Sequence, residues 1–103
     1  MILFTNNMRF LVRIQPTVEG GNKMMTEKNG LKNLQAFYKQ IKGENAFFYE
    51  QGGLRTFEFI VNMSSVDQIP SIAEPMFQAF NAKVEFHPVM LFEDLEKSFS
   101  KKK

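Results

Sequence analysis

Alternation of apolar and polar residues predicts a β-strand at residues 8–15. One side of this segment carries Met8, Phe10, Val12 and Ile14, the period expected of a strand with one buried face. Residues 44–51 and 54–62 are rich in aromatic and β-branched side chains, which favour strands. Gly52 and Gly53 separate these two runs and predict a hairpin turn, because both positions can take a positive φ.

Between these strands the apolar spacing changes to that of a one-sided helix. Spacings of three, four and seven residues predict helices at 22–42 and 65–81. Gly30 predicts a bend or break inside the first helix, and Gly43 predicts the left-handed residue that ends it. Alternation returns at 83–90 and predicts a fourth strand.

The chain of 103 residues is long enough for one domain. We expect that domain to span 8–99, with a short closing helix at 93–99. Residues 1–7 are expected to form a loose extension, and residues 100–103 a disordered basic tail. Met8 is as good a candidate for the start of translation as Met1, since the pattern of the first strand begins there.

The order strand, helix, strand, strand, helix, strand predicts an α+β fold of the ferredoxin-like βαββαβ type. Such a fold has a four-stranded antiparallel sheet with two helices on one face. The helix-covered face is expected to carry Phe10, Val12, Ile14, Phe57, Phe59, Val61, Val84 and Phe86. The opposite face is expected to carry Leu11, Arg13, Phe48 or its neighbours, Thr56, Glu58, Ile60, Glu85, His87 and Val89. Because half of this second set is apolar, the pattern predicts a homodimer that forms through the sheet.

Charge and composition narrow the classes of function. The chain contains thirteen Lys and Arg and eleven Asp and Glu, and three of the lysines are its last three residues. Without those three lysines there are ten basic and eleven acidic residues. The rest of the chain therefore lacks the excess of positive charge expected of a nucleic-acid-binding protein. The absence of cysteine excludes disulfides and thiolate catalysis and favours a cytoplasmic location. No apolar run approaches the roughly 18 residues that cross a membrane.

Three segments carry a resemblance to a known superfamily. They are MRFLVRIQP at 8–16, IPSIAEP at 69–75 and VEFHPVM at 84–90. These segments resemble small bacterial members of the dimeric α/β-barrel superfamily, whose relatives include muconolactone isomerases, antibiotic-biosynthesis and haem-degrading monooxygenases, and stress-responsive proteins. Haem-degrading members use a helical His with an Asn and a Trp. This chain has no Trp, and its one His lies on a predicted strand, so neither a cofactor nor a metal is expected.

Five side chains are candidates for a functional site. His87 is the side chain whose ordinary pKa lies near neutral, and it is predicted to act as a general acid or base in a cavity between sheet and helices. Arg13, Glu58, Glu85 and Tyr49 are predicted to bind and orient a ligand, since a guanidinium pairs with carboxylates in a two-pronged fork. Two alternatives stay open: a structural histidine at an interface, and a salt bridge between subunits.

These features together predict a homodimer that binds a small, mostly apolar or aromatic molecule between sheet and helices. Twelve Phe and seven Met suit such a pocket, although they also fill a small core. Cofactor-free isomerase or monooxygenase chemistry is one possible activity. The alternative is a non-catalytic stress-response or ligand-binding module.

Overall fold

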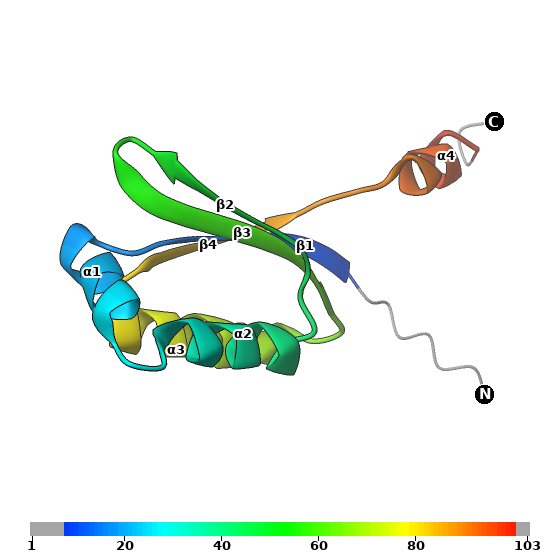
Figure 1. Cartoon of the computed structure of the whole chain (residues 1–103). Coiled ribbons are helices and arrows are strands. Elements are labelled where there is room, and N and C mark those ends of the chain that lie inside the picture. The colour runs from blue at the N-terminus through cyan, green and yellow to red at the C-terminus, as the bar shows by residue number, and fades with distance from the viewer. Residues whose placement is uncertain (1–7, 101–103) are drawn as a thin grey trace.

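A four-stranded antiparallel sheet forms the centre of the protein in the computed structural model, which describes residues 8–100 (Figure 1). Its strands are β1 (Met8–Gln15), β2 (Glu44–Gln51), β3 (Leu54–Met63) and β4 (Lys83–Pro88). They are ordered β2-β3-β1-β4, and each neighbouring pair is antiparallel. The edge strands are therefore β2 and β4, at opposite sides of the sheet.

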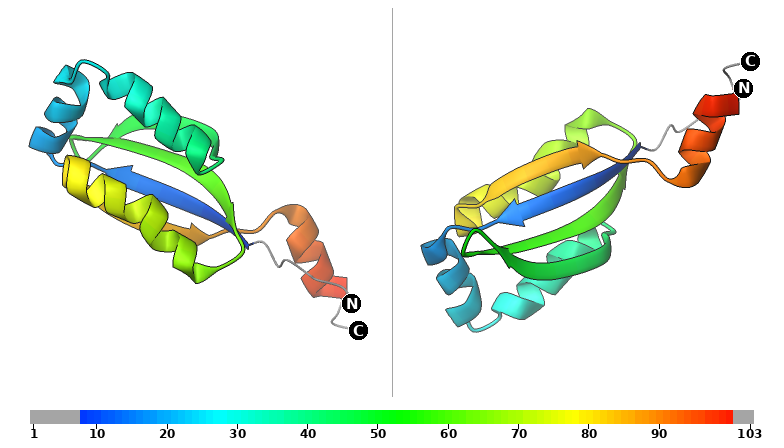
Figure 2. Two further views of the ribbon diagram at one scale, coloured as in Figure 1. Left: turned by 90° about the horizontal axis from the view of Figure 1, so that it is seen from below. Right: turned by 90° about the horizontal axis from the view of Figure 1, so that it is seen from above.

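Three helices cover one face of this sheet. They are α1 (Val18–Thr26), α2 (Gly30–Gln40) and α3 (Ile69–Phe80), the last preceded by a 3-10 turn, η1 (Val66–Gln68). Figure 2 shows the three helices in front of the sheet in its left view, and the opposite face with no helix in front of it in its right view. We call this opposite surface the outer face: it comprises Leu11, Arg13, Phe47, Tyr49, Thr56, Glu58, Ile60, Glu85 and His87.

The expected strands are present, but the first connection differs from expectation. It holds two helices in place of one, and helical structure begins at Val18, four residues earlier than predicted. The break expected at Gly30 is confirmed, because α2 starts at that residue. A side chain there would collide with the carbonyl oxygen of Met24, so glycine allows α1 and α2 to turn closely. The expectation of two helices on the covered face is therefore wrong, since three lie there.

Glycines shape the two ends of β2 in different ways. Gly52 and Gly53 have φ of 63° and 81°, which confirms the predicted hairpin turn. Gly43 was expected to take the left-handed conformation, but the positive φ of 56° belongs to Lys42. Gly43 is required for another reason: a Cβ there would lie 2.5 Å from the ring of Tyr38.

The hydrophobic core fills the layer between the sheet and the three helices. The sheet contributes Val12, Ile14, Phe57, Phe59, Val61 and Met63, and the helices contribute Met24, Leu34, Ile72, Met76 and Phe80. Phe10, Val84 and Phe86 pack against this cluster. All eight residues predicted for the covered face are therefore found there. Each fully buried aliphatic or Phe side chain contributes roughly 1.5–3 kcal/mol to folding.

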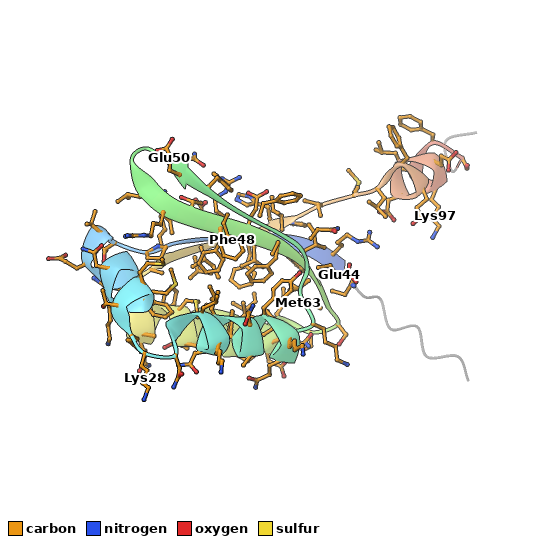
Figure 3. All side chains as sticks on the ribbon, viewed as in Figure 1. Lys28, Glu44, Phe48, Glu50, Met63 and Lys97 are labelled. Carbon is orange, nitrogen blue, oxygen red and sulfur yellow. The ribbon has the colours of Figure 1, made fainter. Side chains whose placement is uncertain are left out.

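The fourth helix, α4 (Phe92–Ser100), lies away from the layer of helices, beyond the end of the sheet (Figures 1 and 2). The closing helix predicted at 93–99 is thus present, and it extends to Ser100, where a disordered tail was expected to begin. The expectations for residues 1–7 and 101–103 lie outside the described residues. In Figure 3 the side chains around Phe48 fill the space below the sheet, whereas those of α4, where Lys97 is labelled, stand apart from it.

Candidate functional site

An apolar pocket opens between α2 and the β2–β3 side of the sheet. Its volume is about 260 Å³. It is lined by Leu31, Leu34, Gln35, Phe37, Tyr38, Ala46, Phe48, Phe57 and Phe59. The pocket lies where a small-molecule site was expected, between the sheet and a helix.

Stacked and edge-on aromatic rings form one wall of the pocket. Phe57 and Phe59 lie on the same side of β3 because side chains two residues apart share a face. Phe48 on β2 is the register partner of Phe57, and the two rings stack with centroids 5.3 Å apart. The ring of Phe57 lies 6.4 Å from that of Phe59, which Tyr38 meets edge-on at 5.8 Å. This wall suits the face of an aromatic ligand.

Two polar side chains of α2 belong to the lining. Gln35 and Tyr38 are three residues apart, so they lie on one side of the helix. An amide and a phenolic hydroxyl can each donate and accept a hydrogen bond. Tyr38 is the one titratable residue among the described residues of the lining. A molecule in the pocket could therefore meet hydrogen-bonding side chains of α2.

A charged cluster occupies the outer face, on the other side of the sheet. Arg13 Nε lies 3.5 Å from Glu58 Oε1, and its Nη1 lies 3.7 Å from Glu85 Oε1. The hydroxyl of Tyr49 donates a 2.6 Å hydrogen bond to Glu58 Oε1. The register explains this grouping, because Arg13 on β1 is paired with Glu58 on one side and Glu85 on the other. The four predicted ligand-binding residues thus form one cluster.

The cluster shifts the pKa values of two of its members. Hydrogen bonding and electrostatic interaction with Tyr49 raise the pKa of the Arg13 guanidinium, and Glu58 raises it further. The hydrogen bond to Glu58 raises the pKa of Tyr49 above its ordinary value of about 10. The phenol holds its proton more tightly because ionisation would remove this hydrogen bond and place two negative charges together.

His87 also lies on the outer face, opposite Leu11 of β1, and it is exposed. Neither His87 nor the charged cluster lines the pocket between α2 and the sheet. His87 thus lies on the outer face, where alternation predicted it, and not in the pocket between sheet and helix that its expected catalytic role requires. Its neighbour Phe86 faces the helices, and alternation along β4 turns His87 the other way. A catalytic role for His87 stays a prediction.

The sequence did not fix which aromatic side chains of β2 face outward and which face the helices. The expected outer-face residue was Phe48 or a neighbour, and the structure places Phe47 and Tyr49 outside and Phe48 inside. The register of β2 shifts between Glu44 and Phe47, and Asn45 has a positive φ of 56°. Such a bulge reverses the inside–outside order of the residues that follow it.

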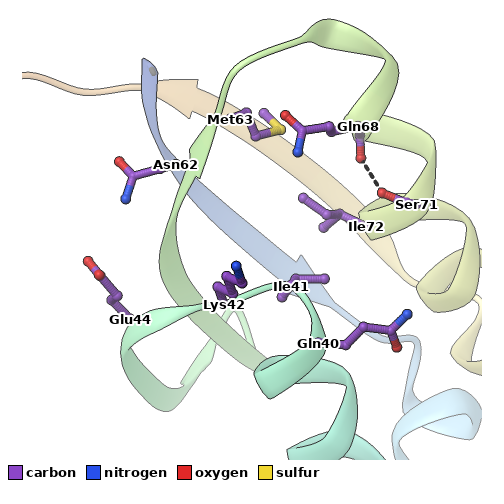
Figure 4. A pocket seen from close by; sticks show the side chains of 9 residues that line it. All are labelled: Gln40, Ile41, Lys42, Glu44, Asn62, Met63, Gln68, Ser71 and Ile72. Atoms are coloured by element: carbon purple, nitrogen blue, oxygen red, sulfur yellow. Dashed lines mark hydrogen bonds between the residues drawn. The ribbon is translucent and has the colours of Figure 1, made fainter. Parts of the chain in front are cut away.

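A second hollow, of about 510 Å³, has a mixed polar and apolar lining and lies at the other end of α2. It is lined by Gln40, Ile41, Lys42, Glu44, Asn62, Met63, Gln68, Ser71 and Ile72. Figure 4 shows Gln68 and Ser71 facing Ile41 and Lys42 across it, with Ser71 Oγ donating a 2.7 Å hydrogen bond to the carbonyl of Gln68. The Gln68 side chain accepts bonds from the backbone N–H groups of Ser64 and Ser65. Gln68 therefore caps the turn before α3.

Comparisons with known proteins do not assign a function to the pocket or to the charged cluster. The chain matches no protein-family model, no curated protein and no solved structure. Within residues 8–100, no three His, Cys, Asp or Glu side chains are grouped so that they could hold a metal ion. No helix in the same part of the chain is long and apolar enough to cross a membrane.

Proposed function

We propose that this protein binds a small, mostly apolar or aromatic molecule in the pocket between α2 and the sheet. The observation that carries the proposal is the ring-walled pocket of about 260 Å³. An apolar cavity of about 150 Å³ holds benzene, so this pocket suits one ring or two fused rings. Gln35 and Tyr38 favour a ligand that carries a hydrogen-bonding group on one edge.

Binding is favoured over catalysis by the chemistry of the lining. General acid–base catalysis needs a titratable group within hydrogen-bond reach of the reacting atom. Tyr38 is the one such group among the described residues of the lining, and His87 lies on the other face of the sheet. We therefore prefer a ligand-binding module to a cofactor-free isomerase or monooxygenase. The cytoplasmic location proposed with it rests on the absence of cysteine.

We further propose that the fold is ferredoxin-like and that two copies pair through their outer faces. The strand order and the antiparallel pairings support the first proposal, with α1 as an addition to the first crossover. Three apolar side chains support the second: Phe47 is 64% exposed, and Leu11 and Ile60 are partly exposed. Arg13, paired with Glu58 and Glu85, is also partly exposed between these apolar side chains, so a partner could cover it.

Fluorescence titration of indole tests the pocket, because the chain has no Trp to mask the signal. Phe48→Ala removes a ring from the pocket wall, and Phe47→Ala is its matched control. The two residues are 63% and 64% exposed and face opposite sides of β2. We expect saturable binding that Phe48→Ala weakens at least tenfold and Phe47→Ala leaves unchanged. Absence of saturable binding of indole, or equal losses in both variants, would overturn the pocket.

Sedimentation of the purified chain at micromolar concentration tests the dimer. Ile60→Lys places a charge on the outer face, and Ala79→Lys places the same charge on an exposed position of α3. We expect the wild-type chain and Ala79→Lys to be dimers and Ile60→Lys to be a monomer. A monomeric wild-type chain would refute pairing through the outer face.

A further inference from the structure

The ligand pocket adjoins a hollow on the exposed side of α2, which we call the lysine hollow. This hollow has a volume of about 520 Å³ and is lined by Lys32, Gln35, Ala36, Tyr38 and Lys39. Gln35 and Tyr38 line the ligand pocket as well, so the two spaces meet at these side chains. A molecule whose ring occupies the pocket can therefore extend a substituent past Gln35 and Tyr38 into the lysine hollow.

Two lysines flank the shared Gln35. Lys32 precedes Gln35 by three residues and Lys39 follows it by four, and residues at these spacings are neighbours on a helix surface. Both lysines are exposed. Each carries its charge at the end of a flexible four-carbon chain, so both ammonium groups can reach a substituent that lies over Gln35. The exposed end of a bound molecule therefore meets positive charge.

The charge of these lysines is not balanced by nearby acids. Residues 28–42, which include all of α2, contain four lysines and no Asp or Glu. None of these four lysines forms an ion pair with another residue in the described range 8–100. Over the same range, no acidic side chain lines the ligand pocket or the lysine hollow. A negatively charged substituent is therefore the kind that this surface favours.

Arg13 is less suited to hold an anion than these lysines are. Its guanidinium lies 3.5 Å from Glu58 and 3.7 Å from Glu85, so an incoming anion would be repelled by two carboxylates. Arg13 also lies on the outer face, on the other side of the sheet from the ligand pocket. The unpaired positive charge that adjoins the pocket is thus that of α2.

We propose that the ligand is an aromatic acid, with its ring in the ligand pocket and its carboxylate between Lys32 and Lys39 in the lysine hollow. Gln35 and Tyr38 can each donate a hydrogen bond to the same carboxylate. Exposed ion pairs are individually weak, so the ring supplies most of the affinity and the lysines supply selectivity for an anion. This inference deepens the proposed function and rests on its pocket.

Two indole derivatives of nearly equal shape test the selectivity for an anion. Indole-3-carboxylate is negatively charged at pH 7, whereas indole-3-carboxamide is neutral. Binding of both can be followed by their fluorescence, because the chain has no Trp. We expect the wild-type chain to bind the carboxylate at least about fivefold more tightly than the carboxamide, the effect of two exposed ion pairs.

Removal of the two lysine charges tests where the anion is recognised. In a variant that carries both Lys32→Gln and Lys39→Gln, we expect the dissociation constants of the two probes to become about equal. The control variant carries Lys23→Gln and Lys97→Gln, which remove the same net charge from exposed positions on α1 and α4. We expect the control to keep the preference of the wild-type chain for the carboxylate.

The outcomes separate this proposal from the pocket on which it rests. If indole and both derivatives fail to bind saturably, the pocket and the aromatic acid both fall. If the carboxamide binds and Phe48→Ala weakens it, but the carboxylate binds no more tightly, the pocket stands and the selectivity for an anion is wrong. If the preference for the carboxylate survives loss of Lys32 and Lys39, or the control loses it equally, the lysine hollow does not hold the carboxylate, which also overturns the proposal.

Discussion

The two faces of one sheet carry different kinds of interaction. The face under the helices is closed by α1, α2 and α3, and Val12, Phe59 and Val61 are at most 1% exposed there. The outer face carries partly exposed apolar side chains around an arginine held by two glutamates. The same strands therefore serve folding on one side and, as we propose, association on the other. Alternation of side chains makes this division possible, since neighbouring residues always belong to different faces.

The contrast extends to the pocket and the charged cluster. The pocket wall is built from rings, and its specificity for a ligand depends on shape and a few polar groups. The cluster is built from charges, and its strength depends on how much water a partner removes from it. Ligand binding and pairing should therefore respond to different substitutions.

The largest expected effect comes from the covered face. Phe59→Ala removes a ring that is 1% exposed and packs against Tyr38 and Phe57, so we expect it to lower the free energy of unfolding by about 3–5 kcal/mol. Phe47→Ala, on the outer face, should change the unfolding of the separated chain by less than about 0.5 kcal/mol. Urea unfolding at submicromolar concentration measures both. Similar losses of stability in the two variants would show that Phe47 is packed against other parts of its own chain.

Alkaline pH should weaken the outer face once Tyr49 loses its proton. The pKa of Tyr49 is raised in the folded chain by its bond to Glu58, so its contribution to stability is complete below about pH 10 and is lost as pH rises through the raised value. Absorbance titration should show a tyrosine step above the ordinary pKa of about 10 that belongs to Tyr49. Glu58→Gln should return that pKa toward its ordinary value, and Tyr49→Phe should remove the late step. An identical titration in Glu58→Gln would contradict the assignment.

The smallest expected effect concerns α4. Deletion of residues 90–103 removes no member of the buried core cluster, so we expect the unfolding free energy of the separated chain to change by less than about 1 kcal/mol. A large loss of stability at low protein concentration would show that α4 belongs to the core of its own chain.

Much of the fold could be predicted from local signals. Alternation located β1 and β4, the double glycine located the β2–β3 turn, and the one-sided stripe located α2 and α3. The start of α1 was missed because 18–21 contains two glycines, Gly20 and Gly21, which weaken any helical pattern. Both are buried, and a Cβ on Gly20 would collide with the backbone of Phe80. These glycines allow a close approach that local propensity does not reveal.

The candidate site was predicted less well than the fold. The grouping of Arg13, Glu58 and Glu85 followed from adjacent strands, and the structure brings them within ion-pair distance. The sequence did not predict that these three residues are separated from the apolar pocket, because it does not indicate on which face of the sheet a cavity lies. Residues such as Gln35 and Ala46 line the pocket and carry no motif that could have identified them.

By itself, the sequence determined the number and order of strands, the choice of buried side chains and the absence of cysteine chemistry. These depend on residue type and short-range spacing, which are local properties of a chain. Only the tertiary structure decided that Phe48 faces the pocket while Tyr49 joins the charges, and that α4 lies apart from α2. The physical reason is that a bulge in β2 and the pairing of distant strands set these positions, and both depend on contacts between residues far apart in the sequence.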